Sequence, residues 1–363
     1  MKYRFFDWAF LAIVLIAVLV LFAFFFERIP TQNNTLAMDW KAIWPSFRDG
    51  NLQYLPVIGG LRFPPWSVIP FLPLGFLSMQ ASWGILAGIG ILILVISVPR
   101  VNSKIIYWLS IFLLVISFPA LRNIADGNME NIVVGGVLLS IYGYDKKNVF
   151  ALAAGILIAT IKIQEVTLLL LVVAFYLFLT WHPGDYLKLG VILTGIIGLS
   201  LIYRGKDWLA AVFGQNYQQY TGSIIDISIT AALKRLGFVP PSIIWLVWIT
   251  ILGCFLYIAW RSRPALSREK VGMLVAGSLL LAPYAAGNSV LSVLAIGIIP
   301  LFQANQLWGG FLIALIDLPF LWSKDMLFNY QAYYWTAIVL VTWISLAWRC
   351  IFTVIQEERC QGR

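Results

Sequence analysis

Charged residues are scarce in this sequence: only 11% of its 363 residues are Asp, Glu, Lys or Arg, whereas 61% are hydrophobic. A soluble globular protein carries about 25% charged residues, because water must solvate its surface. This chain could not cover a water-exposed exterior with so few charges, but a lipid exterior makes no such demand. Its mean hydropathy of +0.88 and its 16 Trp and 15 Tyr are typical of a membrane protein, in which amphipathic rings collect at the headgroup level.

Histidine and cysteine are also rare. The single histidine, His182, argues against zinc or other histidine-rich metal chemistry, so we expect no metal and no cofactor. Three cysteines are too few for a disulfide framework. The net charge of +9 is spread through short connectors and forms no dense patch, which argues against a nucleic-acid partner. No P-loop, dinucleotide fingerprint, HExxH or GxSxG motif is present, which excludes a classical nucleotide-binding domain.

Long apolar runs predict an all-α membrane protein of one domain over residues 1–363, with about twelve (eleven to thirteen) spans. A spanning helix needs roughly 17–25 mostly apolar residues. The first run resembles a signal peptide, but it is longer than the usual apolar core and has no small-residue cleavage site, so we interpret it as an uncleaved span. The predicted spans are 8–26, 81–98, 105–120, 131–144, 149–163, 165–181, 186–203, 241–260, 270–284, 288–303, 305–321 and 333–353.

The segment from Pro64 to Ser78 is apolar but short, and it contains four prolines. Proline interrupts the hydrogen-bond ladder of a helix. We therefore interpret the segment as a re-entrant or interfacial piece that leads into the second span. The alternative is a separate kinked span, which would invert the topology of everything after it.

The distribution of basic residues gives the orientation. With the N-terminus inside, the inner connectors and the two termini hold 14 of the 25 Lys and Arg, at more than twice the density of the outer segments. The positive-inside rule then places both termini in the cytoplasm. The two long loops, 27–64 and 204–240, face outward under this topology, and so do most acidic residues.

The first outer loop carries the strongest candidate for catalysis. Apolar residues between Leu36 and Phe47 recur at roughly helical spacing, which predicts an amphipathic helix on the membrane surface. Asp39 lies on this helix beside Trp40, and Asp49 begins a turn at its end. A carboxylate that is partly desolvated among aromatic rings can act as a general base. The alternative is a solvated acid paired with a nearby basic residue.

Two other outer segments place polar groups at the ends of predicted spans, where such groups tend to be functional. Asn128 and Asn131 flank the start of span 131–144, where either could instead cap the helix. Lys162 and Glu165 interrupt more than thirty apolar residues, which predicts a tight outer hairpin between two spans. An ammonium group there suits a lipid phosphate, although the two side chains could simply form an ion pair with each other.

The order of these features resembles the polytopic GT-C glycosyltransferases, specifically the polyprenyl-phosphate-mannose type of glycosyltransferase family 87. The matching elements are an Asp-aromatic pair in the first outer loop, a following Gly and Tyr, an aromatic-Pro-Pro segment, a Gly-Gln-x-Asn element, a Lys-Pro-x-Pro element and a Ser-Pro segment. In this sequence they correspond to Asp39-Trp40, Gly50, Tyr54, Phe63-Pro64-Pro65, Gly127 to Asn131, Lys162 to Glu165 and Ala282-Pro283-Tyr284. The usual Gln, both prolines of the Lys-Pro element and a histidine are missing here.

The resemblance implies a GT-C-like bundle in the plasma (inner) membrane and transfer of a hexose, mannose-like, from a polyprenyl-phosphate donor to a lipid or glycan acceptor on the extracytoplasmic face. Asp39 would be the general base. Lys162, Arg62 or Arg122 would neutralise the donor phosphate. The other candidate contacts to donor or acceptor are Asp49, Tyr54, Asn128, Asn131, Gln164 and Glu165.

Two other classes of function fit a polytopic chain. A lipid or solute transporter or flippase should show inverted repeats and polar residues near the middle of the membrane, whereas the polar residues here cluster at the outer ends of spans. A non-catalytic scaffold for cell-envelope assembly would be consistent with the missing motif residues. The sequence does not predict an oligomeric state.

Overall fold

The structure is a computed structural model that describes residues 2–31, 36–49, 63–213, 226–237, 240–262, 264–322 and 324–361. These residues form helices joined by short connectors, with no strand among them beyond one isolated bridge between Asp226 and Ala286. The all-α prediction is therefore confirmed for the described part of the chain.

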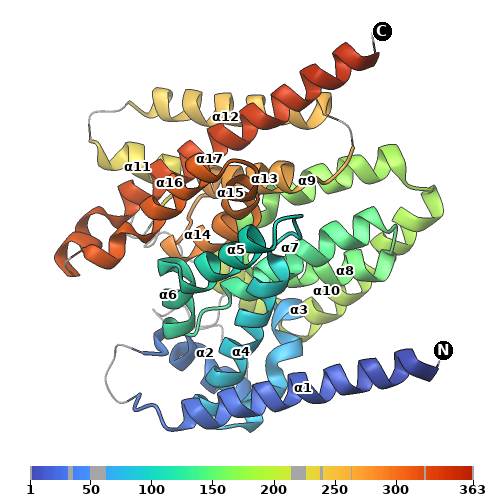
Figure 1. The fold of residues 1–363 in the computed structure, drawn as a ribbon, viewed down its shortest axis with the longest axis vertical. Coiled ribbons are helices and arrows are strands. Elements are labelled where there is room, and N and C mark those ends of the chain that lie inside the picture. Colours follow the sequence, from blue (N-terminus) through green and yellow to red (C-terminus); the bar gives the residue numbers. More distant parts are fainter. Residues whose placement is uncertain are drawn as a thin grey trace.

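The helices follow one another closely along the chain (Figure 1). Those of the first half are α1 (Lys2–Glu27), α2 (Met38–Arg48), α3 (Pro65–Val68), η1 (Ile69–Phe76), α4 (Met79–Ser97), α5 (Lys104–Ile116), α6 (Phe118–Asp126), α7 (Glu130–Asp145), α8 (Val149–Ala159), η2 (Thr160–Lys162) and α9 (Ile163–Thr180). Those of the second half are α10 (Pro183–Phe213), α11 (Ile229–Arg235), α12 (Pro241–Arg261), α13 (Arg268–Leu281), η4 (Gly287–Ser289), α14 (Val290–Val293), the π-helical turn η5 (Leu294–Ile298), α15 (Ile299–Ala304), α16 (Gln306–Asp317), η6 (Leu318–Leu321) and α17 (Lys324–Gln361).

Short polar residues and prolines fix where many of these helices begin. A side-chain oxygen before the helix accepts a hydrogen bond from a backbone N–H of the first turn, which satisfies a donor that has no partner within the helix. Proline suits the first helical positions because it lacks that donor. The caps are Ser78, Ser103, Ser117, Asn148, Ser228, Ser267 and Asn305.

The connectors gather at two opposite ends of the bundle. We call the first the Asp39 end. It brings together α2, the α6–α7 turn, the α8–α9 turn and the segment before α14, which hydrogen bonds join at Asn128–Asp39, Lys162–Glu130 and Ser289–Glu165. Residues 226–227 join it through the bond from the Ile227 N–H to the Ala285 carbonyl, 2.8 Å long.

We call the second the Lys146 end. It brings together the α4–α5, α7–α8, α9–α10 and α12–α13 connectors. Tyr144 stacks on Trp181 with ring centroids 6.2 Å apart and donates to the Pro264 carbonyl at 2.7 Å. Gln303 donates to the Pro99 carbonyl at 2.9 Å. In Figure 1 both chain termini and the α9–α10 connection lie on the right, whereas α2, α6 and α11 lie on the left. The predicted sorting of connectors onto two sides is thus present in the fold.

The number of spans is not confirmed. Six described helices are long and apolar enough to cross a membrane, or seven if the bent pair of α5 and α6 counts as one span. Each of the twelve predicted segments overlaps one or more helices, but several helices are too short to span on their own. The coarser conclusion, a helical protein with several membrane spans, stands.

Two predicted boundaries are wrong. The predicted span 105–120 breaks at Ser117 and bends by 45°, because the Ser117 side chain caps a new helix at the N–H of Ala120 and Pro119 cannot extend the old one. The predicted outer loop 204–240 begins as helix, since α10 continues to Phe213. Its later part holds α11.

The predicted hairpin at Lys162 is present. By length alone, residues 149–180 form one long apolar helix, but the two ends of this run meet. Lys147 donates to the Thr180 carbonyl at 3.4 Å, and Tyr144 lies 3.1 Å from the Thr180 hydroxyl. A straight helix of this length would separate its ends by about 50 Å, so α8 and α9 fold back on each other at η2.

The segment from Pro64 to Ser78 is short, as predicted. It forms α3 and η1, and it is not among the helices long enough to cross a membrane. Both of its ends lie at the Asp39 end: Trp66 donates to the Thr160 hydroxyl at 2.9 Å, and Ser78 donates to Glu27 at 2.5 Å. A chain that enters and leaves at one end is what a re-entrant or interfacial piece requires.

Glycines allow α7 and α8 to pack with their backbones in contact. A Cβ atom on Gly136 would lie 2.4 Å from the Ala159 nitrogen, and one on Gly143 would lie 2.3 Å from the Leu152 nitrogen. Such close approach between small residues is the usual packing mode of helices in lipid, where burial of apolar surface provides no driving force. It fixes the two helices that carry Glu130 and lead to Lys162.

Candidate functional site

Asp39 lies in the first turn of α2, half-buried. Its carboxylate accepts a hydrogen bond of 2.7 Å from the side-chain amide of Asn128, which is 89 residues away in the sequence. The structure therefore brings together two of the residues predicted from separate outer segments.

Two tryptophans dock α2 at this position. Trp40 is completely buried and donates to the Ser82 hydroxyl at 2.8 Å. Trp83, on the same turn of α4, donates to the Ile124 carbonyl of α6 at 2.7 Å. Because Trp40 is locked between α4 and α6, the neighbouring Asp39 has a fixed position relative to the turn that carries Asn128.

Gly127 makes this approach possible. It ends α6 with a left-handed backbone (φ 67°), a conformation that glycine adopts without a steric penalty. A Cβ atom at this position would also lie 2.6 Å from the Cβ of Trp40. Glycine at this position therefore lets the chain reverse direction after α6 and leaves room for the Trp40 side chain.

The orientation of Asn128 is set from its other side. Its Oδ1 accepts the backbone N–H of Glu130, the first residue of α7, at 3.1 Å, although Met129 and not Asn128 occupies the N-cap position of this helix. With Oδ1 directed to α7, the NH₂ group is directed to Asp39. A single side chain therefore bonds both to the start of α7 and to the candidate base.

Behind Asn128 lies a buried cluster of charges. Lys162 is paired with Glu130 at 2.6 Å and with Glu165 at 3.6 Å. Ser289 donates to Glu165 at 2.6 Å, and Ser292 donates to both carboxylates. Buried charges are tolerated when they are paired and hydrogen-bonded in this way. The cluster joins α7, η2, α9, η4 and α14 through charged side chains.

The cluster changes how two predicted residues are to be understood. Lys162 and Glu165 do form the ion pair that the sequence left as the alternative, and both are buried. Their direct contact with a donor stays a prediction, since Lys162 already faces two carboxylates. Gln164, between them, is half-buried.

The remaining predicted residues are dispersed. Arg122 pairs with Asp126 at 2.6 Å, and its side chain is 51% exposed at the Asp39 end. Asp49 is exposed at the far end of α2. Asn131 is buried against Gly90 of α4. Tyr54 and Arg62 lie outside the described residues.

Sequence reasoning missed three features of this site. Ser289 and Ser292 gave no signal, because serine is common in apolar helices. Asp126 is buried beside Asp39, and burial raises the pKa of Asp126, while Arg122 opposes this shift. Asn123 is buried on the same helix, and neither polar atom of its side chain has a hydrogen-bond partner within the described structure.

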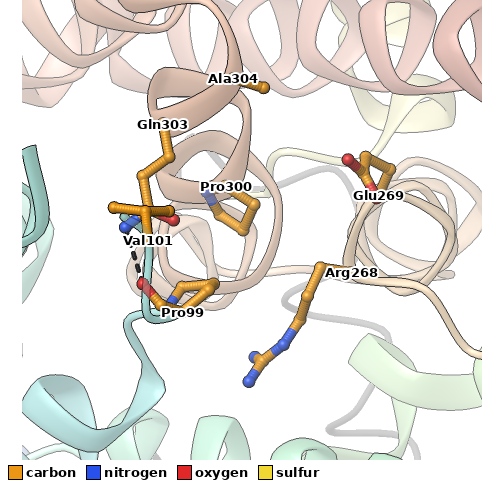
Figure 2. A pocket seen from close by; sticks show the side chains of 7 residues that line it. All are labelled: Pro99, Val101, Arg268, Glu269, Pro300, Gln303 and Ala304. Atoms are coloured by element: carbon orange, nitrogen blue, oxygen red, sulfur yellow. Dashed lines mark hydrogen bonds between the residues drawn. The ribbon is translucent and has the colours of Figure 1, made fainter. Parts of the chain in front are cut away.

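A hollow of about 280 Å³ marks the opposite, Lys146 end (Figure 2). Pro99, Pro300 and Gln303 form one side, and the side chain of Arg268 runs away from the carboxylate of Glu269. Burial lowers the pKa of Arg268, and the nearby Asp145 opposes that shift. No group of three or more His, Cys, Asp or Glu suited to a metal ion occurs within the described ranges.

The fold and the site define a polytopic membrane protein with a carboxylate held at one end of its helical bundle. The model of glycosyltransferase family 87 matches residues 62–286, which is more than half of the chain. The chain therefore belongs to glycosyltransferase family 87 and is a membrane glycosyltransferase. Comparisons with curated proteins and with solved structures gave no match.

Proposed function

We propose that this glycosyltransferase moves a hexose, mannose-like, from a polyprenyl-phosphate donor to a lipid or glycan acceptor on the extracytoplasmic face, with Asp39 as general base. The observation that carries the proposal is the Asn128–Asp39 hydrogen bond of 2.7 Å at the Asp39 end. It places a carboxylate, fixed but still partly accessible, where the connectors meet.

The chemistry needs one base and a good leaving group. Asp39 accepts the proton of an acceptor hydroxyl as the oxygen attacks the anomeric carbon of the donor sugar. The bond between that carbon and the phosphate oxygen breaks, and the electron pair leaves with the polyprenyl phosphate. Because the phosphate is a stable anion, no nucleotide, cofactor or metal is part of this proposal.

The charged residues divide into two roles. Arg122 has an exposed side chain and is the candidate partner for the donor phosphate, since a guanidinium group binds phosphate oxygens in a bidentate manner. Lys162 is buried against Glu130, whose backbone N–H orients Asn128. We therefore assign Lys162 and Glu130 to positioning Asn128 and, through it, Asp39.

The test is sugar transfer, or slow donor hydrolysis, by purified protein in lipid with a panel of polyprenyl-phosphate hexoses. Asp39→Asn should lower turnover roughly 10²–10⁴-fold, the usual contribution of a general base, without lowering the thermal midpoint of unfolding. Asp185→Asn is the matched control, because Asp185 is an accessible acid at the Lys146 end. Turnover that survives in Asp39→Asn would refute Asp39 as the base.

The buried cluster supports one other candidate, a lipid transporter, because charged residues inside a helical bundle often mark a transport pathway. The same experiment separates the two. Donor binding without turnover in wild type and in Asp39→Asn would favour transport, whereas turnover that depends on Asp39 would favour transfer.

A further inference from the structure

The Lys146 end carries a second and larger hollow, of about 820 Å³, between the start of α8 and the start of α10. Three of the residues that line it are lysines, Lys146, Lys147 and Lys188, and the lining includes one acid, Asp185. We propose that this hollow, the α8–α10 groove, binds the headgroup of an anionic phospholipid.

The three lysines make only weak interactions with other groups of the protein. Lys188 lies 3.9 Å from Asp185, with side chains 72% and 40% exposed, and an ion pair of this kind contributes little stability. Lys147 makes one long hydrogen bond of 3.4 Å, to the Thr180 carbonyl. Lys146 is exposed. A phosphate group can therefore interact with these ammonium groups without breaking a buried interaction, and the groove keeps a net positive charge.

The other wall of the groove is apolar and leads into the membrane. Phe150, Leu187 and Val191 line it, and each of the three is exposed. The exposed apolar surface continues along α10, where only 11% of the most apolar stretch is buried. A soluble anion would use the lysines alone, whereas a phospholipid would also place its acyl chains along α10. Charge and apolar surface together favour the lipid.

The groove is separate from the proposed catalytic site. The helix α7 runs from Glu130, at the Asp39 end, to Asp145, at the Lys146 end. Its length corresponds to roughly 24 Å. Under the predicted orientation the groove faces the cytoplasmic leaflet, where anionic headgroups attract basic residues near the ends of spans.

The experiment is native mass spectrometry of the full chain in detergent, titrated with phosphatidylglycerol or with phosphatidylcholine that has the same acyl chains. Wild type should bind phosphatidylglycerol more tightly. The variant Lys146→Gln with Lys188→Gln should lose roughly tenfold in affinity for phosphatidylglycerol, with binding of phosphatidylcholine unchanged. Lys147 is kept, because it has a left-handed backbone and joins α7 to α9.

The matched control is Arg100→Gln with Lys104→Gln, which removes the same charge from two exposed residues, one in the α4–α5 connector and one at the start of α5, also at the Lys146 end. It should retain the preference for phosphatidylglycerol. A second variant, Leu187→Gln with Val191→Gln, leaves every charge in place and should weaken binding of both lipids.

Three results would overturn the proposal. One is equal affinity of wild type for the two lipids. Another is an equal loss in the control variant, which would indicate a general effect of charge. The third is binding of glycerol 3-phosphate as tight as that of phosphatidylglycerol, which would indicate a site for a soluble anion. The thermal midpoints of all variants, measured in the same detergent, show that each one is folded.

Discussion

The two ends of the bundle differ in how deeply their ion pairs are buried. At the Asp39 end, charged side chains are buried and interlocked: Lys162 lies between Glu130 and Glu165, and serine hydroxyls satisfy the carboxylates. At the Lys146 end, the pairs Lys188–Asp185 and Arg349–Glu269 are long and at least partly exposed, although one cation, Lys270, is buried there against Tyr176. A buried polar network fixes geometry, whereas exposed charges remain free to meet a partner from outside. The difference agrees with the roles proposed above, a catalytic site at the Asp39 end and a lipid-binding groove at the Lys146 end.

The largest difference should appear when each end loses a lysine. Lys162→Met leaves two buried carboxylates without their cation, which should lower the free energy of unfolding by about 3–5 kcal/mol. Lys188→Met removes an exposed partner, and the change should stay below about 1 kcal/mol. Thermal unfolding in the same detergent measures both. Equal shifts would show that burial does not distinguish the two ends.

A second comparison uses two glycines that both have positive φ. Gly127→Ala forces a left-handed alanine and a clash with Trp40, so we expect a loss of roughly 2–4 kcal/mol together with lower transfer activity. Gly237, with φ 75°, has no neighbour within 4 Å of such a Cβ atom.

Gly237→Ala should therefore lower the free energy of unfolding only by the strain of a left-handed alanine, about 1–2 kcal/mol, and leave transfer activity unchanged. Unfolding and activity are measured on both variants. A Gly127→Ala protein as active as Gly237→Ala would mean that the docking of Trp40 does not position Asp39.

A third comparison concerns pH. Asn128→Asp places a second carboxylate against Asp39 in place of an amide donor, and two adjacent carboxylates do not both ionise readily. The base is then deprotonated only at higher pH, so the acid limb of the pH–rate profile should move upward. At neutral pH we expect turnover to fall roughly 10- to 100-fold, as for loss of a correctly ionised catalytic base.

Asn148→Asp is the control for that change, at the Lys146 end. Asn148 caps α8 by accepting the N–H of Ala151 at 3.0 Å, and aspartate caps a helix equally well. Its pH–rate profile should match that of the wild type. An unchanged pH–rate profile in Asn128→Asp would show that the side chain at position 128 does not influence the ionisation of the catalytic base.

Much of the fold could be predicted from sequence because apolar runs and connector charges are local signals. They located the helices, the turn at Lys162 and the sorting of connectors onto two sides. They did not reveal the bend at Ser117, where a cap and a proline act within an apolar run, and they did not fix the number of spans, because several helices are shorter than a bilayer requires.

The site was predictable only in part. The aromatic residues around Asp39 and the resemblance to a family predict it as the base, but its contact with Asn128 spans 89 residues, and no spacing rule reaches that far. The sequence does not indicate which serines complete the buried cluster, because a serine hydroxyl in an apolar helix usually bonds to the backbone of its own helix. Which polar side chains meet depends on helix packing, and the close approach of α7 to α8 is such a tertiary effect.

The smallest effect should come from the pair between Glu269 and Arg349 at the Lys146 end. Their charged atoms are 3.8 Å apart, and the side chains are 33% and 37% exposed. Glu269→Gln should change the free energy of unfolding by less than about 1 kcal/mol, and added salt should reduce even that difference. Unfolding measured at low and high salt tests both statements. A loss as large as that in Lys162→Met would place a structurally essential charge at the Lys146 end, and the contrast between the two ends would then have to come from something other than burial.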